Sequence, residues 1–239
     1  MRKMLTLCLL IPFLGFSQAK NVLNAIRVFP RQDKLAEFDK ALASHAQKYH
    51  TGDWKWRVWS IESGPDAGGY MITEGPYSWA ELDGRGDISA EHTADYEKNV
   101  APLTIDRGGS SYAEFQADLS TVQLTDYADK IVMNHMIAKP GMIGAIPEMI
   151  GKLKNAWQAS GQSVAVYLSV ASGDPGYLTV TRLKGGLKEM ASDYRKPLKE
   201  LYNTANGAGS FDGFLKNYAD AVQSRWSELM IFKPELSSK

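Results

Sequence analysis

Residues 60–73 read SIESGPDAGGYMIT, and residues 169–181 read SVASGDPGYLTVT. In each stretch an apolar alternation leads into a Gly- and Pro-containing turn, which is followed by Gly-Tyr and a second apolar run. Glycine and proline between two such segments are typical of the turn in a β-hairpin. The chain therefore encodes the same hairpin twice, which indicates an internal duplication.

The duplication extends toward the N-terminal side of each hairpin. NAIRVFP (residues 24–30) matches NHMIAKP (residues 134–140), which lies 110 positions further along the chain. Apolar residues then recur at three- and four-residue steps, which predicts one helix in each half, ending at Gly52 and at Gly161. The helical positions are Leu35, Phe38, Leu42, His45 and Tyr49, and Ile146, Met149, Ile150, Leu153 and Trp157.

The duplication also continues beyond each hairpin. SWAELD and GLKEMA predict a second helix in each half, and SYAEFQADLS and RWSELMIFKPELS predict a closing strand. The resulting order, β-α-β-β-α-β, is that of a ferredoxin-like unit. We therefore predict an α+β fold with ferredoxin-like repeats at residues 20–120 and 129–239, joined by a linker at residues 121–128.

A ferredoxin-like unit covers one face of its sheet with helices and leaves the other face bare. Because both units belong to one chain, each can cover the bare face of the other. The expected architecture is two repeats packed sheet to sheet as an intramolecular α/β barrel.

Residues 1–19 have the pattern of a secretory signal peptide: Arg2 and Lys3, an apolar run over residues 4–16, and the small residues Ser17 and Ala19 at the cleavage positions. We expect export to the bacterial periplasm or secretion, with no transmembrane segment after cleavage. The single cysteine, Cys8, lies in this segment, so the mature chain is expected to lack disulfides.

Charge and motif content exclude several functions. The chain has 27 basic and 27 acidic residues, and a nucleic-acid-binding protein would need a basic face. The patterns G-x-S-x-G and H-E-x-x-H and the P-loop are absent from the sequence. Nucleophilic hydrolysis, zinc proteolysis and nucleotide hydrolysis therefore lack support.

Residues 21–239 resemble a tandem member of the dimeric α/β-barrel superfamily. The second half, ending in RWSELMIFKPELS, is similar to NIPSNAP-like proteins. The superfamily also includes antibiotic-biosynthesis-type monooxygenases, haem-degrading enzymes and muconolactone isomerases, so the resemblance implies a fold more than one chemistry.

Three functions stay open at this point. The first is an exported protein that binds a small apolar or aromatic molecule in the cleft between the halves. The second is a cofactor-independent or haem-dependent oxygenase or isomerase on the same scaffold, and the third is a structural envelope protein.

Haem is considered only through the resemblance, and no cofactor is predicted from the residues themselves. The haem-degrading branch uses an Asn, a Trp and a His, which Asn24, Trp79 and His92 match in order. Trp79 comes earlier than the pattern requires, and its separation from His92 is longer. The second half has Leu187 in place of the Trp and no counterpart of His92.

Asn24 and Asn134 occupy equivalent positions on the first strand of each half. We expect both amides to face the inter-sheet cavity and to orient the polar end of a ligand, together with His135, Trp56 and Tyr167. The alternative is that the asparagines form hydrogen bonds to neighbouring strands, since buried amides need partners.

No metal site is predicted. His45 belongs to the apolar stripe of its helix, and His50 lies five residues further on, outside the i, i+4 geometry of a helical metal site. His92 is expected to face solvent.

Strand WKWRVWSIE leaves one assignment open. Aligned with SVAVYLSVA, it places Lys55 and Arg57 on the helix-covered face. Either a bulge near Val58 changes the alternation or both residues lie at an exposed strand start.

Overall fold

The computed structural model describes residues 18–239. The signal peptide predicted over residues 1–19 lies almost entirely outside this range, so it stays a prediction. Within residues 18–239, no helix combines the length and apolar character needed to cross a membrane.

The strands within residues 18–239 form one closed barrel, and every pair of neighbouring strands is antiparallel. Around the barrel the order is β4-β1-β3-β2 in the first half and β8-β5-β7-β6 in the second. The strands are β1 (Val22–Pro30), β2 (Trp56–Ile61), β3 (Tyr70–Tyr77), β4 (Thr104–Phe115), β5 (Lys130–Ala138), β6 (Val164–Val170), β7 (Gly176–Arg182) and β8 (Val222–Phe232). The predicted α+β class and the closed barrel are confirmed.

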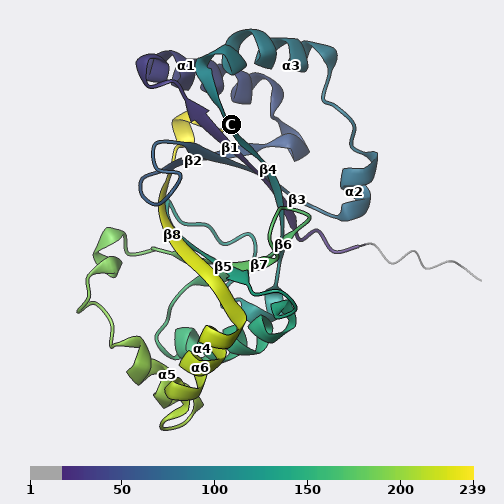
Figure 1. The fold of residues 1–239 in the computed structure, drawn as a ribbon. Helices are drawn as coiled ribbons and strands as arrows, with labels where there is room; N and C mark the ends of the chain where they lie inside the picture. The colour runs from purple at the N-terminus through teal and green to yellow at the C-terminus, as the bar shows by residue number, and fades with distance from the viewer. Residues whose placement is uncertain (1–17) are drawn as a thin grey trace, which may run out of the picture.

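Helices lie on two opposite sides of the barrel, with α1 and α3 over the first half and α4, α5 and α6 over the second (Figure 1). Their bounds are α1 (Leu35–Tyr49), α2 (Trp79–Gly84), α3 (Ala90–Asp95), α4 (Ile146–Ala159), α5 (Leu198–Asn206) and α6 (Ser210–Ala221). The periodic stripes of α1 and α4 predicted both helices correctly. The helix predicted at GLKEMA is wrong, because residues Leu187–Met190 form only a short 3-10 turn and α5 begins later.

Burial divides the molecule into three layers. Each helical side has its own apolar core, with Phe38 and Leu42 of α1 in one and Ile150 and Trp157 of α4 in the other. The third core lines the barrel interior. It contains Trp59, Ile61, Met71, Ala113, Phe115, Ile131, Met133, Ala165, Tyr167, Val180 and Met230.

Two short seams join the halves. β2 pairs with β8 at three positions, and β4 pairs with β6 at four. Each seam is extended by the segment that follows β4 or β8, FQADLST (residues 115–121) and FKPELSS (residues 232–238), which we call the clasp segments.

The two clasp segments form equivalent hydrogen bonds with the second strand of the opposite half, which is β6 for residues 115–121 and β2 for residues 232–238. In each, the first serine hydroxyl donates to the carbonyl oxygen four residues before it and accepts a strand N–H. The next hydroxyl accepts a second N–H of the same strand. The strand N–H contacts are Val166 to Ser120 (2.8 Å), Val164 to Thr121 (2.8 Å), Val58 to Ser237 (2.9 Å) and Trp56 to Ser238 (2.9 Å).

The segment predicted as a linker, residues 121–128, lies against one end of the barrel. Val122 and Leu124 pack against the interior core. The ring of Tyr127 lies 4.1 Å from the guanidinium carbon of Arg57. We call this the linker end, and the end that carries the β2–β3 and β6–β7 loops the hairpin end.

The position of Arg57 settles the open assignment on β2. Arg57 shares the inner face with Trp59 and Ile61, and Lys55 precedes the strand. Glu74 pairs with both Asn24 and Trp56. Thr179 pairs in the same way with both Asn134 and Val166. Trp56 and Val166 are therefore the equivalent residues of the two halves. Neither proposed explanation was needed, since the sequence alignment of this strand was one residue out of register.

Candidate functional site

The hairpin end of the barrel contains a cavity of about 320 Å³. Its apolar wall is continuous with the interior core through Ala25, Met71 and Met133. Its polar groups come from both halves, and they include Arg27, Ser111, His135, Ser169, Asp174 and Trp226. A cavity of this size with a few converging polar groups can hold a small organic molecule.

An ion-pair network crosses the barrel beside this cavity. Arg27 of β1 donates from both terminal nitrogens to the carboxylate of Glu228 on β8, at 2.7 and 2.6 Å. Because β1 and β8 are not neighbours in the barrel, this bidentate contact spans the interior. Arg27 also donates to Asp66 of the β2–β3 loop at 2.6 Å, so the loop is tied to the network.

His135 of β5 completes the network. Its Nε2 lies 2.8 Å from Glu228 Oε2, and its ring stacks on Trp226 with centroids 4.3 Å apart and planes 9° from parallel. A ring nitrogen that faces a carboxylate carries the proton, so Nδ1 holds the lone pair of the neutral ring. No residue within 18–239 forms a hydrogen bond with Nδ1, and the ring lines the cavity.

Glu228 is charged at neutral pH. Burial on its own would raise the pKa of this carboxyl, but the hydrogen bonds from His135 and Arg27 outweigh burial and lower the pKa to about 2. The carboxylate therefore holds the His135 ring in one tautomer and can stabilise an imidazolium if Nδ1 accepts a proton.

A second, mostly apolar compartment of about 80 Å³ lies toward the linker end, where Tyr127, Ala128 and Arg182 line it. The two compartments share Ala25, Met71, Ala113, Met133 and Leu178, so they are adjacent parts of one interior. Tyr167 lines the second compartment, where burial raises its pKa to about 12, and the phenol stays neutral. The interior therefore offers an apolar chamber between the Arg27–Glu228–His135 network at the hairpin end and the guanidinium groups of Arg57 and Arg182 at the linker end.

Two of the five predicted ligand-binding residues face this interior, His135 and Tyr167. The expectation for the asparagines is wrong, because Asn24 lies on the same strand face as Val28 and Asn134 on the same face as Met136, and both of these residues belong to the helix-side cores. Asn134 donates to Thr179 at 3.4 Å and accepts from Ser227 at 2.7 Å, which matches the structural alternative.

Trp56 also lies outside the barrel, in the core beneath α1. Its ring stacks on His50 with centroids 3.4 Å apart. The residue is therefore a part of the helix-side layer and does not reach the interior cavity.

The three residues of the haem-type pattern do not fit a haem site. Asn24 is buried on the helix-facing side of β1. Trp79 is 37% exposed and lies beside Tyr112. The Nε2 of His92 is 3.2 Å from the Nε2 of His50, so its ring is directed at another imidazole. The prediction that His92 faces solvent is wrong, since the side chain is half-buried.

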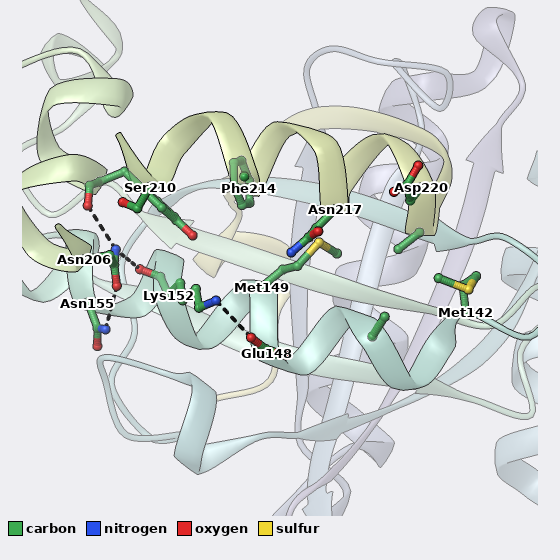
Figure 2. A pocket seen from close by; sticks show the side chains of 14 residues that line it. Met142, Glu148, Met149, Lys152, Asn155, Asn206, Ser210, Phe214, Asn217 and Asp220 are labelled. Atoms are coloured by element: carbon green, nitrogen blue, oxygen red, sulfur yellow. Dashed lines mark hydrogen bonds and ion pairs between the residues drawn. The ribbon is translucent and has the colours of Figure 1, made fainter. Parts of the chain in front are cut away.

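A larger hollow of about 660 Å³ lies between α4 and α6, outside the barrel (Figure 2). Its ionisable side chains include Glu148 and Lys152, which are exposed and paired with each other at 2.9 Å. Asn155 and Asn206 also bond to each other. We consider the barrel interior the better site, because its polar groups converge at the end of an enclosed apolar chamber.

Arg27, Glu228 and Asp66 were not predicted as site residues from the sequence. A signal was present for two of them, because Arg27 lies on the same strand face as Leu23 and Ala25, and Glu228 lies on the same strand face as Met230. A charged residue at a core-facing position of a strand needs a partner across the interior. Asp66 lies in a loop, where an acidic residue carries no such signal.

Comparison with known proteins supports the fold. No protein-family model matches the sequence, and no curated protein matches it. The chain is similar to the structure of an anthrone oxidase-like protein, with 12% identity, a TM-score of 0.58, and coverage of 90% of this chain and 92% of the other.

Two further structures have the same fold. One is a protein from Fusobacterium nucleatum provisionally described as a monooxygenase, with 13% identity, a TM-score of 0.54, and coverage of 88% of this chain and 91% of that one. The other is a mutant chlorite dismutase from Candidatus Nitrospira defluvii, with 7% identity, a TM-score of 0.53, and coverage of 92% and 94%. At these identities the likeness establishes the dimeric α/β-barrel fold alone.

Proposed function

We propose that the barrel interior binds a small, largely apolar or aromatic molecule. The supporting observation is the chamber itself, in which an apolar wall ends at the Arg27–Glu228–His135 network. An apolar body placed against Met71 and Met133 would bring a polar substituent to His135. Binding energy would come from the apolar wall and orientation from the polar end.

A second candidate function, proton abstraction from the bound molecule, is favoured by the His135–Glu228 pair. Nδ1 of His135 would accept a proton from an acidic C–H or O–H, and the carboxylate of Glu228 would stabilise the resulting imidazolium. Returning the proton to another carbon is an isomerisation. Passing the substrate anion on to dioxygen is the chemistry of a cofactor-independent oxygenase, which agrees with the oxidase-like and monooxygenase-like fold neighbours.

Binding can be measured with 2-naphthol, a fluorescent aromatic molecule with one ionisable hydroxyl. The full chain should shift its emission saturably. Ser169 lines the cavity, and a phenyl ring there would occupy the space, so Ser169→Phe should weaken binding at least about tenfold. Each 1.4 kcal/mol lost is a factor of ten.

The matched control places the same ring in the other hollow. Asn217 lines the space between α4 and α6 (Figure 2), and Asn217→Phe should bind 2-naphthol like the unaltered chain. Loss of binding in Asn217→Phe with none in Ser169→Phe would contradict the interior site, as would the absence of saturable binding.

Proton abstraction can be measured with 2-tetralone, whose acidic C–H protons exchange with deuterium in D₂O. The chain should accelerate this exchange, followed by NMR, and His135→Gln should abolish the acceleration because its amide cannot accept the proton as imidazole does. An equal exchange rate in the variant would refute the role of His135.

The finer sequence predictions also stay proposals. We infer that the two halves descend from one ferredoxin-like unit, which the parallel strand orders β4-β1-β3-β2 and β8-β5-β7-β6 support. The similarity to NIPSNAP-like proteins and export through residues 1–19 rest on the sequence patterns alone.

A further inference from the structure

Three of the four histidines in the chain gather outside the barrel, between α1 and α3. His45 lies on α1, His50 directly follows that helix, and His92 lies on α3. One ring nitrogen of each lies within 4.8 Å of the other two. The trio is separate from the barrel cavity, which contains the fourth histidine, His135.

Two of these rings have a hydrogen-bond acceptor at Nδ1, the nitrogen on the side away from the cluster. Nδ1 of His45 lies 2.8 Å from the Asp95 carboxylate, and Nδ1 of His50 lies 3.1 Å from the carbonyl oxygen of Trp54. A neutral ring facing an acceptor carries its proton on that nitrogen. In both rings the lone pair is therefore on Nε2, the nitrogen available to the cluster.

Of these two lone pairs, the one on His45 lacks a donor within residues 18–239. His45 is 1% exposed, and its buried Nε2 has no hydrogen-bond partner there. The Nε2 atoms of His50 and His92 are 3.2 Å apart, so without an ion the N–H of His92 can donate to the lone pair of His50. The buried Nδ1 of His92 has no partner within these residues, whether or not an ion is bound. A buried acceptor without a partner is costly, and a cation at the centre would satisfy the Nε2 lone pairs.

The spacing and the surroundings suit a tetrahedral metal. Zn–N bonds of about 2.0–2.1 Å at tetrahedral angles place ligand nitrogens roughly 3.3 Å apart, which the His50–His92 distance of 3.2 Å already matches. Metal-bound imidazoles ordinarily donate their second nitrogen to a carboxylate or a backbone carbonyl, as His45 and His50 do. Asn99 donates to the other oxygen of Asp95 at 2.9 Å and fixes its orientation.

A free positive charge close to the trio would repel a bound cation. The nearby cation Arg85 is paired with Glu74 and lies over the ring of Trp54, so its charge is already compensated.

We propose that His45, His50 and His92 form a binding site for a divalent transition-metal cation, for which Zn²⁺ is the best match, with the fourth position open to water. Three imidazoles are a nitrogen-only ligand set of the kind that zinc favours. The bound ion would fasten the short helix α3 to α1. This inference is independent of the function proposed for the barrel interior.

The test is calorimetric titration of the full chain with Zn²⁺, after metal removal and without a histidine tag. We expect one ion per chain. His92→Gln should weaken binding more than about 100-fold, since losing a second-shell partner alone costs 10- to 100-fold. His92 is the half-buried member of the trio, and circular dichroism verifies that the variant is folded.

The matched control is His135→Gln, which removes a histidine from the barrel and should leave Zn²⁺ affinity unchanged. Co²⁺ supplies a second readout, because tetrahedral coordination should give intense visible absorption that His92→Gln loses. Asp95→Asn should keep the Co²⁺ spectrum while weakening the affinity about tenfold or more.

Three results would overturn the site. They are the absence of saturable Zn²⁺ binding to the unaltered chain, equal affinity in folded His92→Gln, and a larger loss in His135→Gln than in His92→Gln.

Discussion

Glu228 connects the two halves at the level of single residues. Its side chain has no exposed surface and touches Arg27 from the first half and His135 from the second. Removing one partner of a buried ion pair leaves uncompensated charge, which costs about 3–5 kcal/mol. The network that orients His135 is therefore also a structural requirement of the barrel.

This arrangement predicts the behaviour of the protein in acid. The pKa of Glu228 is about 2 in the folded chain, against an ordinary value of 4.5. Above pH 4.5 the carboxylate is charged in both states and its contribution to stability is complete. As the pH falls from 4.5 toward 2 the unfolded chain takes up the proton first, so about 3 kcal/mol of stability is lost.

Urea unfolding at several pH values between 7 and 3 measures this loss. Glu228→Gln should be less stable at pH 7 by about 3 kcal/mol and should lose less stability on acidification than the unaltered chain. Glu97 is exposed, and Glu97→Gln should follow the unaltered chain. Parallel curves for Glu228→Gln and the unaltered chain would contradict the assignment.

At the level of elements, the sequence pattern predicted where the helices α1 and α4 lie, but not which face of each strand points into the barrel. The apolar stripes located α1 and α4 because a helix that covers a sheet needs one continuous apolar face. Alternation on a strand separates two faces but does not say which one points inward. Asn24 and Asn134 were placed inside for this reason, and the one-residue error on β2 exchanged its faces.

Most contacts of the candidate site could not be predicted from the sequence. Arg27 and Glu228 are 201 residues apart and meet only because the barrel closes. His92 meets His45 and His50 only because α3 folds back over α1. No local pattern encodes such contacts, although charged residues within apolar strands do signal that partners exist.

Replacing glycine by alanine should have opposite effects on stability at two positions, one in β4 and one in α4. Gly108 on β4 has a φ of +125°, and a Cβ there would clash with the carbonyl oxygen of Arg27. Gly108→Ala should therefore destabilise the protein by about 2–3 kcal/mol. Gly151 lies inside α4 with nothing within 4 Å of a Cβ, so Gly151→Ala should stabilise by roughly 0.5–1 kcal/mol.

Thermal unfolding of the two variants measures both effects. Equal stability of Gly108→Ala and the unaltered chain would show that β4 can move away from β1, which the closed barrel does not allow. Destabilisation by Gly151→Ala would indicate that the surface of α4 is more crowded than the structure shows.

For the whole molecule, the two clasp segments make the halves depend on each other. Ser120 accepts a hydrogen bond from Val166, and Ser237 accepts one from Val58. Ser120→Ala and Ser237→Ala should each leave a buried strand N–H unpaired and cost about 1–3 kcal/mol. Because the seams are on separate parts of the barrel, the double variant should show the sum.

Urea unfolding checks this prediction, with Ser110→Ala as the control because Ser110 is exposed on β4. Only the clasp variants should shift the unfolding midpoint. A neutral Ser237→Ala beside a destabilising Ser120→Ala would show that the two seams are not equivalent.

The clasp on β2 also has a consequence for the order in which the protein is made. The partner of Val58 follows it by 179 residues, so the outer edge of β2 cannot be completed until the ribosome has translated nearly the whole second half. An uncovered strand edge is a template for pairing with other chains, and contacts between distant residues form slowly. During synthesis the first half must therefore wait with an open edge, and this interval is when the chain is most prone to aggregate or to need a chaperone.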